Sequence, residues 1–224
     1  MPAVVRRADW RFTSRSDGDF AIDAPGVDAD RAALLRVAGG PDVAWNWLRQ
    51  VHGARVVVTD APGRHQGTEA DALVTATPMV PIAVQSADCG AVVLTSAAGV
   101  VGVAHAGWRG LVAGVVQATV AAMRELGAGP VDAHVGPMIH PGCYEFGTDD
   151  LQVVVEAFGP SVVGRTVTGS PALDLPAAVE AALVAAGATL VTVSAGCTAC
   201  GASRWYSHRA RRESGRMAAV AWAR

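Results

Sequence analysis

The middle of this 224-residue chain reads SADCGAVVLTSAAGVVGVAHAGWRG at residues 86–110. It contains two apolar runs rich in β-branched residues, Ala91–Thr95 and Val100–Ala104, which are typical of buried strands. The segment Ser96–Gly99 between them ends in glycine, as tight turns often do. The stretch therefore predicts an antiparallel β-hairpin.

The predicted hairpin brings two metal-binding side chains together. If the two runs pair around the turn, Gly90 faces His105, and Cys89 faces Ala106. The Cys89 thiol and the His105 imidazole then emerge within a few ångströms of each other at one end of the hairpin. His52, in the motif QVHG, also follows a predicted strand and can converge on the same sheet edge.

Two imidazoles and one thiolate form a ligand set that suits zinc. Because His52, Cys89 and His105 leave one of four positions free, the pattern is typical of catalytic zinc, where water can be activated. Asp88, beside Cys89, is a candidate partner of the ligands or proton carrier. The residues alone also allow a simpler interpretation, with Cys89 as a small buried hydrophobe and His105 as a hydrogen-bonded core histidine.

The residues after His105, AGWRG, lead into a predicted helix at Gly110–Leu126. Glycines let the backbone approach a ligand closely, and the start of a helix offers free N–H groups to an anion. Arg109 adds a forked cation suited to phosphate, and Trp108 offers a flat face to a ring. Taken alone, the segment also fits a tight strand-to-helix turn with a core tryptophan.

The rest of the chain alternates β-rich runs with amphipathic segments. Helices are expected at Asp28–Val37, Asp149–Phe158 and Pro176–Ala186, and strands at Val43–Gln50, Arg55–Thr59, Ala72–Thr75, Val80–Gln85, Val131–Val135, Thr189–Ser194 and Met217–Trp222. This order predicts an α/β (α+β) protein in which mixed β-sheets are flanked by helices. Because no linker or repeat is visible, we expect a single domain over residues 1–224.

The composition excludes several classes of protein. A formal charge of −2 indicates no nucleic-acid-binding stripe. All 18 basic residues are arginine, which excludes a P-loop lysine and a pyridoxal Schiff base. Mean hydropathy is +0.30, but the apolar stretches are too short to span a membrane, and the N-terminus does not look like a secretory signal. We expect a cytoplasmic monomer or homodimer without membrane or nucleic-acid partners.

Four cysteines in a cytosolic chain of this size do not predict a disulfide framework. Cys197 and Cys200 form a single CTAC motif. A structural zinc site would need a second such pair, so we interpret this one as structural or incidental. His140 and Cys143 are candidates for lining a pocket, and His134 is expected in the core.

Motifs from Trp47 to the C-terminus resemble the YfiH-type family, whose members are called laccase-domain proteins, polyphenol oxidases or purine nucleoside phosphorylases. The matches, in family order, are WLRQVHG (47–53), ADALVT (70–75), SADC (86–89), AHAGWRG (104–110), GPMI with CYEFG (136–147), LDL (173–175), CTAC followed by WYSHR (197–209) and GRMAAV (215–220). The pairing of SADC with AHAGWRG is highly specific, whereas residues 1–44 match weakly.

The resemblance implies a YfiH-like fold of β-sheets flanked by helices. Carried over position by position, the family's metal ligands are His52, Cys89 and His105, the residues that the hairpin already brings together. The resemblance also implies a zinc cofactor, with copper possible. It further implies phosphorolysis of adenosine, inosine and S-methyl-5'-thioadenosine, together with deamination of adenosine. The expected small-molecule partners are therefore purine nucleosides and phosphate.

The remaining candidate residues take distinct roles in that chemistry. The catalytic set is Cys89, His105, Asp88 and Arg109, where Asp88 carries a proton and Arg109 binds phosphate. The substrate-binding set is Trp108, Gly110, His140 and Arg209, where the backbone N–H at Gly110 helps Arg109 to hold phosphate.

Three other functions stay open from the sequence. A copper-dependent polyphenol oxidase is one, although two histidines and one cysteine cannot build the several copper centres of a true laccase. A hydrolase of a peptidoglycan precursor, with Cys89 as nucleophile and His105 as base, would survive a chelator. A non-enzymatic zinc-binding module would hold its metal in a closed four-ligand site and unfold on chelation.

Overall fold

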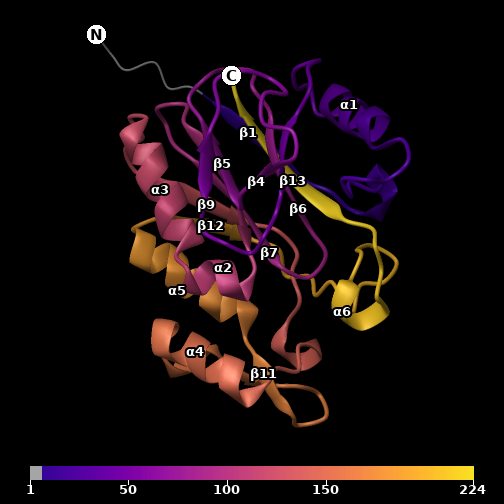
Figure 1. The fold of residues 1–224 in the computed structure, drawn as a ribbon, viewed down its shortest axis with the longest axis vertical. Helices are drawn as coiled ribbons and strands as arrows, with labels where there is room; N and C mark the ends of the chain where they lie inside the picture. The colour runs from indigo at the N-terminus through magenta and orange to yellow at the C-terminus, as the bar shows by residue number, and fades with distance from the viewer. Residues whose placement is uncertain (1–6) are drawn as a thin grey trace.

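The computed structural model describes residues 7–224 and confirms the α/β prediction, with two mixed sheets packed face to face and helices outside them (Figure 1). The five-stranded sheet has the order β1 (Ala8–Phe12), β13 (Met217–Ala223), β6 (Ile82–Ser86), β2 (Asn46–Arg49) and β4 (Thr68–Glu69). The six-stranded sheet has the order β12 (Thr189–Val193), β9 (Asp132–Val135), β7 (Gly90–Thr95), β8 (Val101–Ala106), β5 (Ala72–Thr75) and β3 (Val56–Val58).

Six helices and a small ribbon complete the part of the chain that the structure describes. The helices are α1 (Val27–Val37), α2 (Trp108–Val112), α3 (Val115–Glu125), α4 (Thr148–Phe158), α5 (Leu175–Ala186) and α6 (His208–Arg211). The ribbon pairs β10 (Val163–Arg165) with β11 (Pro171–Leu173), and single 3-10 turns lie at Arg15–Asp17, Pro141–Cys143 and Pro160–Val162. Within residues 7–224, no helix has the length and apolarity needed to cross a bilayer.

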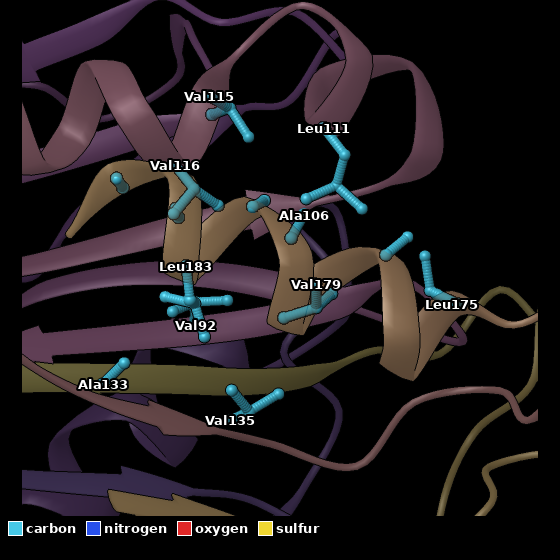
Figure 2. Packing of buried hydrophobic residues seen from close by; sticks show 14 of the residues in the cluster. Val92, Ala106, Leu111, Val115, Val116, Ala133, Val135, Leu175, Val179 and Leu183 are labelled. Carbon is cyan, nitrogen blue, oxygen red and sulfur yellow. The ribbon is translucent and has the colours of Figure 1, made fainter. Parts of the chain in front are cut away.

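Successive side chains of a strand point to opposite faces of its sheet, and this divides the core into layers. Val92 and Leu94 of β7 belong to the apolar cluster under the helices, whereas Val93 belongs to the cluster between the two sheets. Figure 2 shows Val92 packed among side chains such as Leu183 of α5 and Val116 of α3. Strands buried on both faces explain why these runs are apolar throughout instead of alternating.

The outer face of the five-stranded sheet is covered by α1 and the segment around Phe20. Leu35 of α1 packs in one cluster with Phe20, Trp45 and Trp222, all of them at most 2 % exposed. Figure 1 shows α1 on the opposite side of the sheets from α2, α3 and α5. The layers are therefore, in order, helix α1, the five-stranded sheet, the six-stranded sheet, and helices α2, α3 and α5.

The hairpin forms as predicted, but the predicted register is wrong by one residue. His105 faces Ala91, and Gly90 faces Ala106. The turn holds one residue more than expected, because Gly99 adopts a left-handed φ of 79° and Ser96 still bonds to Val100. Under the predicted register Cys89 and His105 would point to opposite faces. The observed one puts them on the same face.

Two further expectations need correction. The single helix expected at Gly110–Leu126 is two helices, α2 and α3, because Gly114 has a φ of 86° and ends the helical path between them. The short strands β1 and β4 were not expected from the sequence. In β1, Ala8–Phe12 forms an edge strand that pairs with the C-terminal strand β13.

Candidate metal centre

The site lies where the chain crosses from one sheet to the other. Three connections lead from the five-stranded sheet to the six-stranded sheet: β2 to β3, which carries His52; β4 to β5, which carries Asp71; and β6 to β7, which carries Cys89. Because β2, β4 and β6 are neighbours, their ends meet at one edge of the five-stranded sheet. His105 approaches the same edge from β8, the partner of β7.

The predicted ligands His52, Cys89 and His105 come together there. One donor atom from each residue lies within 4.8 Å of the other two. Cys89 Sγ is 3.9 Å from His52 Nε2, and the imidazole rings of His52 and His105 meet edge to face at 4.7 Å between centroids. His105 is buried while His52 is exposed, so the cluster opens to solvent on one side. This openness is the pattern of catalytic zinc sites.

Asp71 organises the cluster, and the sequence did not identify it. Its carboxylate is fully buried and accepts hydrogen bonds from the backbone N–H groups of Val51, His52 and Gly53, at 2.8–3.1 Å. The same carboxylate lies 2.9 Å from His105 Nδ1. The contact leaves Nε2 of His105 as the atom that faces a metal, a common arrangement for zinc-binding histidines.

The charges of Cys89 and His105 stabilise each other and shift their pKa values in opposite directions. Burial alone would raise the pKa of the Cys89 thiol, but the charge and hydrogen bonds of His105 and a hydrogen bond from His52 lower it to about 6. Burial opposes the charge of His105, but Cys89 and Asp71 together raise the pKa of His105 to about 9. The lowered pKa of Cys89 favours the thiolate, which is the form that binds metal.

Gly107 leaves room for the ligand atoms. A Cβ at this position would lie 2.7 Å from His52 Cδ2 and 3.2 Å from Cys89 Sγ. Real Cβ atoms do not approach a ring carbon so closely, so only glycine lets both ligands stand here. Together with the chemistry of the three donors, this space fits a zinc ion bound by His52, Cys89 and His105.

A Gly107→Ala variant tests that fit. The added methyl group is expected to displace the His52 ring and to weaken zinc binding about 10- to 100-fold, because ligand positioning has effects of that order. Zinc affinity is measured by competition with a chromophoric chelator. Gly129→Ala is the matched control, since Gly129 is exposed and its Cβ would meet nothing within 4 Å. Equal zinc affinities for the two variants would contradict the geometry.

Asp88 lies beside the ligands, but its carboxylate points toward the C-terminal segment. Oδ1 accepts a hydrogen bond of 2.6 Å from the Thr198 hydroxyl, and Oδ2 accepts one of 2.6 Å from the Arg209 N–H. The residue is 7 % exposed and adopts a left-handed φ of 106°. Both contacts therefore hold the strained backbone that presents Cys89.

The AHAGWRG segment packs against the site. Trp108 meets the edge of Phe146 at 5.4 Å between ring centroids, and the exposed Arg109 guanidinium stacks over Trp108 at 4.3 Å. Gly110 approaches the backbone of Gly53, where a Cβ would lie 3.0 Å from the Gly53 carbonyl. This contact brings α2 against the loop that carries His52.

The other two expected substrate-binding residues, His140 and Arg209, contact the CTAC motif and the segment at residues 144–145, respectively. His140 donates its backbone N–H to Cys197 Sγ at 3.5 Å. Arg209 lies over the Tyr144 ring at 4.9 Å and donates to the Glu145 carbonyl. His134, expected in the core, is 5 % exposed and stacks on Trp10.

A cavity of about 690 Å³ opens beside the metal ligands, and all three contribute to its wall. Its size suits a small molecule such as a nucleoside. Two arginines, Arg49 and Arg216, also line its wall, and the sequence singled out neither of them. The expected residues Trp108, Arg109, Gly110, His140 and Arg209 do not line it.

The position of Arg49 in the sequence is a signal that it lies near the site. It lies three residues before His52 in the motif WLRQVHG, on β2, and it is exposed. Arg216 is already engaged, because its guanidinium donates to the carbonyls of Glu213, Ser214 and Gly215. Arg49 is thus the cavity's best-placed guanidinium for an anionic ligand.

The amino-acid sequence of this chain is similar to that of a known protein family and of several purine nucleoside phosphorylases. The model of the multi-copper polyphenol oxidoreductase laccase family matches residues 15–224. A purine nucleoside phosphorylase of Streptomyces coelicolor is 39 % identical, with 98 % of this chain and 97 % of that protein aligned. A purine nucleoside phosphorylase of Xylella fastidiosa strain 9a5c is 39 % identical over 90 % of this chain and 81 % of its own length.

Solved structures share the fold. A Neisseria meningitidis protein superposes with a TM-score of 0.82 at 30 % identity, covering 96 % of this chain and 93 % of the other. The YfiH protein of Bacillus licheniformis superposes with a TM-score of 0.84 at 24 % identity, covering 96 % and 92 %. The similarity therefore extends across the whole fold and includes both sheets.

Proposed function

This chain belongs to the multi-copper polyphenol oxidoreductase laccase family, and we propose that it is a zinc-dependent purine nucleoside phosphorylase. We further propose adenosine, inosine and S-methyl-5'-thioadenosine as substrates, with deamination of adenosine as a second activity. The observation that carries the proposal is the open cluster of His52, Cys89 and His105 on the wall of a nucleoside-sized cavity. Zinc bound there supplies a Lewis acid with an open position.

The chain's own residues prepare this site for chemistry. Asp71 fixes the His105 ring and the backbone around His52, so the ligands need little rearrangement when metal binds. Burial of His105 keeps water away from one side of the cluster, while the cavity leaves the other side open to a substrate. The sequence makes Asp88 a candidate proton carrier, but both of its oxygens already accept hydrogen bonds, from Thr198 and Arg209, so we assign it the positioning of Cys89 instead.

Product analysis tests the proposal directly. The zinc-loaded protein is incubated with each nucleoside, with and without phosphate, and the products are identified by mass. Phosphate-dependent release of free base is expected, with ribose 1-phosphate from adenosine and inosine and 5-methylthioribose 1-phosphate from S-methyl-5'-thioadenosine. Conversion of adenosine to inosine is also expected. Failure to convert any purine nucleoside would refute the function.

The phosphate-binding role of Arg109 is tested against that of Arg49. Arg109→Ala is expected to raise the KM for phosphate about tenfold or more while leaving the KM for nucleoside nearly unchanged, because a guanidinium contact to an anion contributes on the order of 1.5–3 kcal/mol. Arg49→Ala is the paired variant, since Arg49 lines the cavity and Arg109 does not. A larger rise for Arg49→Ala would move the phosphate site into the cavity, and equal effects on both substrates would remove the assignment from Arg109.

A copper-dependent phenol oxidase is the second candidate, and one observation favours it. Two histidines and one cysteine are also the ligand set of single blue-copper sites. Metal analysis of protein purified without added copper separates the two functions. Zinc with nucleoside turnover supports the phosphorylase, whereas copper with phenol oxidation supports the oxidase.

A further inference from the structure

The fold brings a third thiol to the CTAC motif. Cys143, at the end of the 3-10 turn Pro141–Cys143, meets Cys197 and Cys200, and the three sulfur atoms lie within 4.8 Å of one another. Cys143 Sγ and Cys200 Sγ are 3.3 Å apart. We name Cys143, Cys197 and Cys200 the cysteine cluster. The sequence offered only an isolated pair, and the missing partner is Cys143.

We propose that the cysteine cluster is a second metal site, which binds Zn²⁺ through three thiolates and a water molecule. A tetrahedral ion with Zn–S bonds of about 2.3 Å separates its sulfur ligands by about 3.8 Å. The spacing in the cluster fits that separation with small adjustments. Cys200 is exposed and gives solvent access to the fourth position. This inference does not depend on the substrate of the first site.

Backbone N–H groups already point at one of the proposed ligands. Cys197 Sγ accepts a hydrogen bond of 3.5 Å from the His140 N–H, and the N–H groups of Ala199 and Cys200 also face it. Burial raises the pKa of Cys197, but these N–H groups outweigh it and the net pKa is lowered. Hydrogen bonds of this kind stabilise a thiolate, which is the form that binds metal.

Cys143, in contrast, is held in its protonated form by its neighbours. Burial, a hydrogen bond to Cys200 and the nearby Cys197 charge raise the pKa of Cys143 to about 12. A bound cation would remove this penalty, and the cysteines would release their protons as the metal binds.

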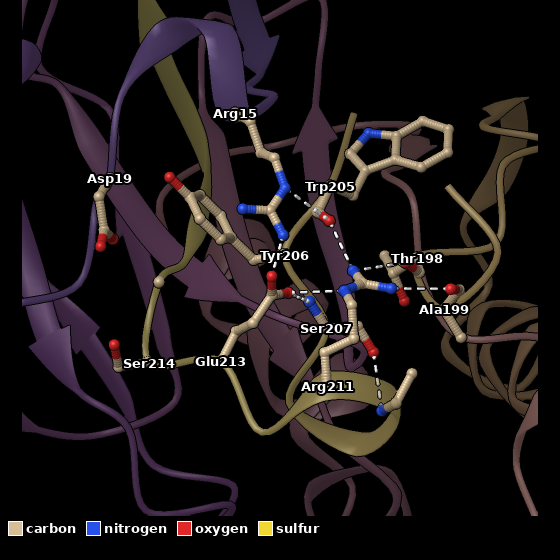
Figure 3. Close-up of polar contacts among 12 residues, drawn as sticks. Arg15, Asp19, Thr198, Ala199, Trp205, Tyr206, Ser207, Arg211, Glu213 and Ser214 are labelled. Atoms are coloured by element: carbon tan, nitrogen blue, oxygen red, sulfur yellow. Dashed lines mark hydrogen bonds and ion pairs between the residues drawn. The ribbon is translucent and has the colours of Figure 1, made fainter. Parts of the chain in front are cut away.

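Polar contacts also tie the CTAC loop to the segment around Glu213 (Figure 3). The Arg211 guanidinium donates to the carbonyls of Thr198 and Ala199, at 3.3 and 2.8 Å, and is itself held by the Glu213 carboxylate at 3.1 Å. Arg15 pairs with the other oxygen of Glu213. A loop fixed in this way presents its two thiols with little loss of entropy on binding.

The segments that carry the cysteine cluster are linked to the first metal centre through Asp88. Thr198, between the two CTAC cysteines, donates its hydroxyl to Asp88, and the Ile139 N–H donates to the Asp88 carbonyl at 2.9 Å. Both segments that carry the cluster are therefore hydrogen-bonded to Asp88, the residue before Cys89. Zinc in the cluster would join these two segments and so support the position of Cys89.

Zinc content per chain tests the proposal. Each protein is produced with zinc, purified under reducing conditions without chelator, and analysed for metal. About two zinc ions per chain are expected in the natural protein and about one in Cys200→Ser, whose changed side chain is exposed and should not affect folding. Cys89→Ala should also keep about one, because it removes the first site and leaves the cluster. The double variant should keep almost none.

Alkylation gives a second readout that does not depend on activity or on the first site. In the Cys89→Ala background, zinc is expected to slow iodoacetamide labelling of Cys143 and Cys197 by at least about tenfold, and Cys200→Ser should abolish that protection. Loss of one zinc ion on Cys200→Ser, together with zinc protection of Cys143 and Cys197 that is seen only when Cys200 is present, supports the site. Unchanged zinc content in Cys200→Ser, or a Cys143–Cys200 disulfide in place of the second ion, would overturn it.

Discussion

His52→Asn is expected to remove the zinc of the first centre and to lower nucleoside phosphorolysis by about a thousandfold, with the fold intact. A metal that polarises the reacting group contributes several kcal/mol to the transition state, and about 4 kcal/mol corresponds to that factor. His52 is exposed, and its side chain serves the cluster and not the core. Zinc content, kcat/KM and circular dichroism measure the three parts of this result.

Asparagine is the suitable replacement because of the backbone. His52 has a left-handed φ of 59°, and asparagine adopts that conformation at lower cost than alanine does. The Asp71 carboxylate can therefore keep its hydrogen bonds to the backbone of the loop, and the change is confined to the lost imidazole.

His65→Asn is the matched control, since it makes the same chemical change outside the metal cluster. It should retain zinc and full activity. The pair also separates the zinc enzyme from a cysteine hydrolase, because a Cys89 nucleophile with His105 as base does not require His52. Activity that survives both His52→Asn and a chelator would support the hydrolase.

The proximity of Cys89 and His105 could be predicted because their contact is local. Cys89 and His105 lie on the two arms of one hairpin, and the loop between the arms is too short to separate them. The register depended on the conformation of Gly99, which a sequence does not specify, so the pairing was wrong by one residue while the proximity was correct. The break between α2 and α3 could not be predicted for the same reason, because it depends on the left-handed conformation of Gly114.

Contacts between distant segments could not be predicted in this way. The sequence places Asp71 within the recognised motif ADALVT, yet nothing local says that this carboxylate holds the loop of His52. The cysteine cluster needs Cys143 to meet Cys197 and Cys200 across the fold. The cavity likewise joins Arg49 to segments near both chain ends. Such juxtapositions depend on the sheet order, which periodicity does not give.

Asp71→Asn is expected to cost more stability than any other single change discussed here, at about 3 kcal/mol. The carboxylate is 0 % exposed and receives four hydrogen bonds through two oxygens. Burial raises its pKa, but the His105 contact and the backbone N–H groups outweigh it, so the net pKa is lowered and the charge is kept. Hydrogen bonds to a charged acceptor contribute about 1.5–3 kcal/mol each.

An asparagine cannot satisfy these donors in either orientation. With its NH₂ group at the place of Oδ2, it opposes the N–H groups of Val51 and Gly53. With the NH₂ group at the place of Oδ1, it opposes the His52 N–H and forces His105 to accept through Nδ1, which gives the tautomer that cannot bind metal through Nε2. Zinc affinity should therefore fall about 10- to 100-fold in addition to the loss of stability.

Thermal unfolding of the metal-free proteins isolates the stability effect from zinc binding. A loss of about 3 kcal/mol in a domain of this size lowers Tm by about 6–12 °C. Asp60→Asn is the control, because Asp60 forms only an exposed ion pair with Arg64, and such pairs contribute little. A Tm for Asp71→Asn as high as that of Asp60→Asn would mean that the donors around position 71 find other partners. Asp71 would then be neither the support of the His52 loop nor the residue that sets the His105 tautomer.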